Sequence, residues 1–216
     1  MQRIGAGEVL VRPYNPVLVA LLVNLMSLCV YSAASADTFS AVLVPFTGGD
    51  VEVEFTLSDD VGDGTIRGAL QLVKGAGDLR ALFLNIADSR LLLGLSVTGD
   101  DVTGFTTGTV IDLGMGANLN GGGTPCPCDI GIEFGSSGMG KDDIGATEFS
   151  LSHETEALTL ALFFEQLVGV RVTSVGDDYD SSREDSAKLV GVVPEPGTAP
   201  LLLLGLVGLG FTRRRR

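Results

Sequence analysis

Two apolar segments, one near each end of the chain, constrain its architecture more than any other feature of its 216 residues. The first is the run 17–31, which is preceded by Arg3 and Arg12 and followed by the Ala-Ser-Ala sequence at 34–36. A basic start, an apolar run and an Ala-x-Ala site are typical of a secretory signal peptide. We therefore predict that residues 1–36 are a signal peptide, with an uncleaved membrane anchor as the alternative.

The second apolar segment, residues 199–211, follows a Pro-Glu-Pro sequence at 194–196. Two prolines in three residues favour an extended hinge, because proline can neither continue a helix nor donate to a sheet. Thirteen residues make about 20 Å of helix, which is short for a bilayer core of about 30 Å, but long arginine stems reach the headgroups. The chain ends in a cluster of four arginines, Arg213, Arg214, Arg215 and Arg216. We predict a tail helix that inserts in the membrane.

Charge differs sharply between the two ends and the middle of the chain. Residues 37–192 hold 25 acidic and 8 basic residues, a net charge of −17, whereas the basic residues of both ends flank the apolar segments. Because basic flanks stay on the cytoplasmic side, both ends are expected there and the acidic body is expected to be exported. The acidic balance also argues against nucleic-acid binding, which needs clustered Lys and Arg.

Taken in order, the Pro-Glu-Pro sequence, the Leu/Gly-rich apolar segment and the arginine cluster resemble the PEP-CTERM sorting signal of Gram-negative bacteria. The resemblance covers residues 193–216. It implies that Pro194, Glu195 and Pro196 are recognised by an exosortase, a membrane-embedded protease, and that the arginine cluster is a cytoplasmic anchor. It further implies transient residence in the inner membrane and delivery to the cell surface or extracellular matrix, where exopolysaccharide is an expected partner.

The body, residues 37–192, shows the alternation of apolar and polar residues that predicts half-buried strands. In 50–57, for example, Val51, Val53 and Phe55 alternate with polar residues, and a turn-forming Asp/Gly cluster follows. Nine segments of this kind lie at 39–46, 50–57, 66–72, 79–87, 91–98, 130–134, 147–151, 168–175 and 188–192. An all-β fold is expected, an antiparallel and jelly-roll-like β-sandwich. The segment 157–167 fits both periodicities, and we favour a short helix or helical turn.

Two features of the body could support cysteine or histidine chemistry. Cys126 and Cys128 flank a proline, and in an exported protein a disulfide is expected; free thiols, or redox or metal chemistry, are the alternatives. A zinc site would need two further ligands, which His153, the one histidine of the chain, does not supply. We expect His153 to be solvated or to cap a turn.

The acidic turn clusters are the best metal-binding candidates, because calcium prefers several carboxylate and carbonyl oxygens. Asp177, Asp178 and Asp180 form the densest of them. None of the clusters has the spacing of a calcium-binding loop, and solvated turns are the ordinary alternative. The sequence 135–142 nearly matches a phosphate-binding loop, but Asp142 stands where Ser or Thr should bind magnesium. No cofactor is expected, and calcium is the one candidate.

These observations predict a non-enzymatic, exported protein with a structural or adhesive role in an extracellular polymer. One alternative is a carbohydrate-binding module that calcium assists. It is disfavoured because sugar platforms usually expose aromatic rings, whereas the chain has no Trp and Tyr179 is the only tyrosine after residue 36. The other two alternatives are a surface hydrolase that uses two carboxylates and a protein that its tail holds permanently in the membrane.

Overall fold

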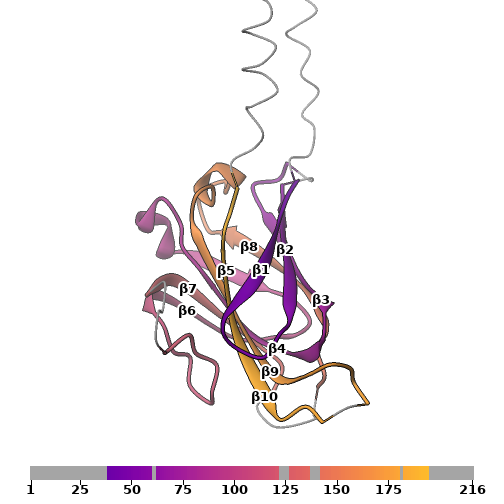
Figure 1. Ribbon diagram of the computed structural model, residues 1–216. Coiled ribbons are helices and arrows are strands. Elements are labelled where there is room, and N and C mark those ends of the chain that lie inside the picture. Colours follow the sequence, from indigo (N-terminus) through magenta and orange to yellow (C-terminus); the bar gives the residue numbers. More distant parts are fainter. Residues whose placement is uncertain (1–37, 60–61, 122–126, 137–141, 181, 195–216) are drawn as a thin grey trace, which may run out of the picture. The chain divides into compact units, whose positions relative to one another are not determined.

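The computed structural model describes residues 38–59, 62–121, 127–136, 142–180 and 182–194 (Figure 1). Ten strands make up nearly all of the regular structure: β1 (Thr38–Gly48), β2 (Glu52–Ser58), β3 (Ile66–Lys74), β4 (Ala76–Leu84), β5 (Leu95–Thr98), β6 (Val102–Val110), β7 (Cys128–Phe134), β8 (Ala146–His153), β9 (Leu167–Gly176) and β10 (Asp185–Val192). Two short 3₁₀ turns, η1 (Ser89–Leu92) and η2 (Leu160–Leu162), complete it.

All strand pairs are antiparallel, and the strands form one continuous sheet in the order β5-β8-β3-β2-β1-β10-β9-β4-β7-β6. Strand β1 joins the two halves, because its residues 38–43 pair with β2 and its residues 44–48 pair with β10. The register shifts between Pro45 and Thr47, and such a bulge bends a strand. We call β5-β8-β3-β2 with the first part of β1 the first half, and β10-β9-β4-β7-β6 with the rest the second half.

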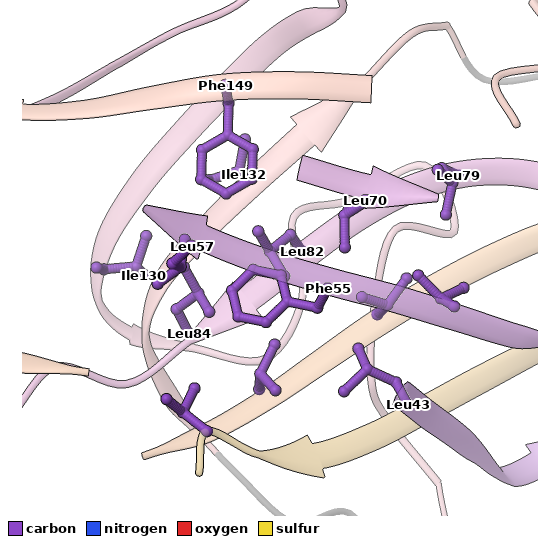
Figure 2. Packing of buried hydrophobic residues seen from close by; sticks show 14 of the residues in the cluster. Leu43, Phe55, Leu57, Leu70, Leu79, Leu82, Leu84, Ile130, Ile132 and Phe149 are labelled. Carbon is purple, nitrogen blue, oxygen red and sulfur yellow. The ribbon is translucent and has the colours of Figure 1, made fainter. Parts of the chain in front are cut away.

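The main hydrophobic core contains inward-facing side chains from both halves of the sheet (Figure 2). Phe55 and Leu70 come from the first half, and Leu82 and Ile132 come from the second. Aromatic rings also meet in this core, since the ring centroids of Phe134 on β7 and Phe149 on β8 are 6.2 Å apart. One apolar residue at every second position therefore supplies the core, as the alternation of the sequence predicts.

The chain passes between the halves at a glycine. Gly75 is the single residue between β3 in the first half and β4 in the second, and its φ is +74°. An L-residue rarely adopts this conformation, and a Cβ at Gly75 would stand 2.8 Å from Val51 Cγ1. Glycine therefore allows both the sharp reversal and the close packing that this crossing needs.

The antiparallel all-β prediction is confirmed, and the structure corrects its details. The two layers of the predicted sandwich are the two halves of one continuous sheet. The structure has ten strands where the sequence predicted nine. The predicted strand 91–98 is a 3₁₀ turn followed by the four-residue β5. In 157–167 the structure has the short 3₁₀ turn η2, in agreement with the helical turn that we favoured. Strand β6 was missed, because VTGFTTGTV has threonines and glycines in place of a clear apolar alternation. The signal peptide and the tail helix lie outside the described residues.

Candidate functional site

The outer faces of the two halves of the sheet differ, and this difference locates the candidate site. On the second half, residues 111–121 lie over the sheet and form a second hydrophobic cluster with Ala81 and Phe83 of β4. The close approach depends on glycine, since a Cβ at Gly169 of β9 would stand 2.4 Å from Leu119 Cδ1. Around β4 and β9, the outer face of this half is thus covered by the protein itself.

The outer face of the first half carries a groove of about 890 Å³. Its lining comes from β2, β3, β8, the end of β5 and the turn 99–101. The register of the strands places the outward side chains in cross-strand rows. One row runs Thr38, Ser58, Arg67, Ser150, Thr98, and the next runs Ser40, Thr56, Ala69, Glu148. Five strands at about 4.8 Å spacing make the first row about 19 Å long.

A small residue forms the floor of the groove. Ala69 on β3 lies between Thr56 on β2 and Glu148 on β8, so longer polar side chains flank a methyl group. One wall is the turn 99–101, which carries Asp100 and Asp101. This turn presses on β8, because a Cβ at Gly99 would stand 2.5 Å from the carbonyl oxygen of Glu148.

Much of the hydrogen-bonding capacity of the groove is unused by the protein. Within the described part of the chain, several groove residues make no hydrogen bond through their side chains, among them Thr56, Gln71, Thr98, Glu148 and Ser150. At the border of the groove, by contrast, Thr38 Oγ1 donates to Ser58 Oγ at 3.1 Å. Hydroxyl, carboxamide and carboxylate groups that face solvent in a groove can accept and donate to a polar ligand.

No local sequence signal pointed to this groove. Each strand contributes one or two polar residues that alternate with core residues, as any half-buried strand does. Thr98 and Glu148 join Thr56 and Arg67 in the groove only because β8 pairs with both β3 and β5. The excess of hydroxyl side chains over charged ones at these outward positions is the one hint that the sequence contains.

The predicted calcium cluster is an exposed loop that is tied to the body by other residues. Asp178 Oδ1 accepts a hydrogen bond from the Asp180 N–H at 2.9 Å, as in an Asx turn. The hydroxyl of Tyr179 donates to the carbonyl oxygen of Gly77 at 3.3 Å, and the Arg183 guanidinium lies 5.1 Å from the centroid of the Tyr179 ring. In the described part of the chain, no three His, Cys, Asp or Glu side chains are grouped as metal ligands would be.

The other residues singled out from the sequence have structural surroundings. His153 Nδ1 accepts the backbone N–H groups of Thr155 and Glu156, and Nε2, which then carries the proton, donates to the carbonyl oxygen of Leu93 at 2.9 Å. This is the turn-capping role that we expected for His153. Cys128 is buried at the start of β7 and is disulfide-bonded. Its partner and Cys126 lie outside the described residues, so the pairing of Cys126 with Cys128 stays a prediction.

The folded body ends at the beginning of the predicted sorting signal. Val193 is 1% exposed, its N–H donates to the Gln166 carbonyl at 3.0 Å, and its carbonyl accepts from the Glu165 N–H at 2.9 Å. Pro194 is the last described residue and is exposed. Glu195, Pro196 and the arginine cluster lie outside the described residues. Contacts that hold the body together thus reach Val193, one residue beyond β10.

Both junctions between the body and its terminal segments lie at one end of the sheet. Strand β1 begins at Thr38, β10 ends at Val192, and the two strands are antiparallel neighbours. The start of one and the end of the other therefore face the same direction (Figure 1). None of the helical turns in the described ranges has the length and apolar character that crossing a bilayer requires.

One comparison with known proteins gives a match. The family model of the PEP-CTERM protein-sorting motif matches residues 192–216. No curated protein and no solved structure matches the chain. This motif implies that the protein is exported and sorted through an exosortase. The motif implies that the C-terminal tail anchors this protein in the membrane until the exosortase, a membrane protease, processes it.

Proposed function

We propose that the protein is a non-enzymatic adhesive component of the cell surface or extracellular matrix, which holds exopolysaccharide in the groove of the first half of the sheet. The observation that carries the proposal is the groove itself, where hydroxyl, carboxamide and carboxylate side chains surround Ala69. Sugars carry hydroxyl groups that both donate and accept hydrogen bonds. Side chains from several rows of the groove can therefore bind successive units of one polysaccharide chain.

Recognition in this proposal depends on hydrogen bonds and not on stacking. No aromatic side chain faces outward from the rows of the groove, since Phe149 points into the core. Tyr179, the tyrosine of the described body, is engaged by Gly77 and Arg183. Shallow contacts of this kind favour weak binding at each sugar unit. The repeated units of a polymer and the many copies of the protein on a surface strengthen the overall binding.

The first experiment measures retention of the mature protein, purified from the producing cells, on the polysaccharide fraction of the same cells. The Ala69→Leu variant should lose most of its retention, because the larger side chain fills the floor of the groove. Thr106→Leu is the matched control, since Thr106 is exposed on β6 outside the groove. Equal retention of both variants and the unchanged protein would show that the groove is not the adhesive site.

The same samples separate adhesion from hydrolysis. A hydrolase would release oligosaccharides from the bound polymer, and release would stop when Glu148 is changed to Gln, because hydrolysis needs a pair of carboxyl groups. We expect no release over the time in which the polymer stays bound. Turnover that depends on Glu148 would replace the adhesive proposal with the hydrolase.

A second experiment tests the processing step. We expect Glu195→Ala to stop removal of the tail, so that the protein in the membrane fraction keeps its full mass. The control is Glu184→Gln, an exposed carboxylate in the body. Intact-mass measurement distinguishes the two forms, and a normally shortened Glu195→Ala product would contradict a role for this glutamate in recognition.

A further inference from the structure

We propose that the groove selects an amine-bearing polysaccharide, a chain of amino sugars with free ammonium groups, over acidic chains and over fully acetylated ones. This inference rests on the proposed function and adds the chemical class of the ligand. It follows from where the groove places its charged side chains.

Carboxylates dominate the charged lining of the groove. Three of them, Asp100, Asp101 and Glu148, lie along its β8 side, and Arg67 is the one cation in the lining. Glu148 lies beside the Ala69 floor, and its side chain makes no hydrogen bond within the described part of the chain. In the strand register, the charged residue directly opposite the floor is therefore a carboxylate, and Arg67 lies two residues away along β3.

Arg67 is outnumbered by these carboxylates. It lies one row away from Glu148, between Ser58 and Ser150, at the junction end of the sheet. Its charge also helps to lower the pKa of Asp63, after the larger effect of the hydrogen bond from the Thr65 N–H. Arg67 therefore acts on a carboxylate outside the groove as well as lining it, and three carboxylates against one guanidinium leave the lining with an excess of negative charge.

The remainder of the body adds to this selectivity. The net charge of −17 over residues 37–192 repels a polyanion and raises the local concentration of a polycation. An ammonium group donates charge-assisted hydrogen bonds to carboxylates, which are stronger than bonds between neutral groups. Hydroxyl side chains at Thr56, Thr98 and Ser150 remain for the neutral part of each sugar.

The test compares three oligosaccharides of equal length on the mature protein by calorimetry, at a mildly acidic pH at which glucosamine is protonated. They are a deacetylated β-1,4-glucosamine chain, its fully acetylated counterpart and a uronic acid chain. We expect the deacetylated chain to bind about tenfold or more tightly than the acetylated one, as one good charged hydrogen bond implies. The uronic acid chain should bind least.

Substitutions inside and outside the groove test whether the groove is responsible for this selectivity. Glu148→Gln keeps the shape of the side chain and should remove most of the preference for the deacetylated chain. Glu184→Gln removes the same one negative charge outside the groove and should leave this preference unchanged. A preference that survives Glu148→Gln, or that Ala69→Leu does not abolish, would overturn the inference. Equal binding of all three chains would also overturn it and would leave the adhesive function standing. Absence of any glycan binding would remove the proposed function itself.

Discussion

The ring of Phe149 lies directly against Gly68, its cross-strand neighbour in the β3–β8 ladder, so closely that a Cβ at Gly68 would stand 2.1 Å from Cζ of the ring. The pair lies on the core side of the two strands that carry the floor of the groove. Packing of the core and geometry of the groove are therefore coupled at this point of the sheet.

This contact makes Gly68 sensitive to a single methyl group. Gly68→Ala should lower the free energy of unfolding by about 1–3 kcal/mol, because a well-packed core must move to admit it. A smaller partner should relieve the clash, so the cost of Gly68→Ala is expected to be smaller in a Phe149→Leu background. Urea denaturation of the unchanged protein, the two single variants and the double variant measures the coupling energy. Strictly additive effects on the free energy of unfolding would contradict the contact.

A buried ion pair in the second half offers a second prediction. Arg80 is 4% exposed, its Nη2 donates to Glu133 Oε1 at 2.6 Å, and its Nη1 donates to the carbonyl oxygen of Phe134. Glu133→Gln leaves the guanidinium with a weaker partner and should lower the free energy of unfolding by about 1–3 kcal/mol.

The double variant Arg80→Met/Glu133→Gln tests the reason for that loss. If the cost comes from an unbalanced buried cation, replacing the cation with an apolar side chain of similar length should recover much of the stability. Chemical denaturation measures both proteins. A double variant that is less stable than Glu133→Gln would show instead that the Arg80 bond to Phe134 is the main contribution.

Asp78 predicts an unusual pH dependence. The carboxyl group is 4% exposed and accepts the Ile144 N–H at 3.1 Å. Burial raises the pKa of Asp78, an effect that the Ile144 hydrogen bond and Arg80 only partly oppose. The folded state thus holds the proton more tightly than the unfolded state, and stability from this group is lost as pH rises from about 4 through the raised pKa.

We expect Asp78→Asn to remove this loss, because the amide oxygen still accepts the Ile144 N–H and carries no charge. The stability of the variant relative to the unchanged protein should increase across that pH window and then stay constant. Asp88 is the control of opposite sign. Hydrogen bonds from Arg90 lower the pKa of Asp88 to about 2, so its contribution is present above about 4 and is lost as pH falls. Denaturation at a series of pH values separates the two.

The end of the folded body at Val193 predicts where the chain tolerates change. Val193→Ala should cost about 1.5 kcal/mol of unfolding free energy, since it removes two buried carbon atoms. Pro194→Ala, one residue further and exposed, should cost nothing measurable. Similar losses for both variants would show that the body extends into the sorting signal.

Much of the strand content could be predicted from the sequence, because a half-buried strand imposes a period of two on its residues. Strand β2 follows that pattern along its length, and β9 follows it from Val168 to Val172. Strand β6 did not, because it lies at the edge of the sheet, where exposed threonines and glycines replace alternate apolar residues. The turn η2 was ambiguous because 157–167 satisfies both periods.

The sorting signal can be predicted from residues 193–216 without knowledge of the fold, because it is defined by a local order of prolines, apolar residues and arginines. The strand segments are readable for a similar reason: a period of two is a local property of the backbone. The groove is different. Thr98 and Glu148 join Thr56 and Arg67 only when β8 pairs between β3 and β5. On the second half, the outer face around β9 is covered only when Leu119 packs on Gly169. These pairings are contacts between residues far apart in the chain, and tertiary structure decides them.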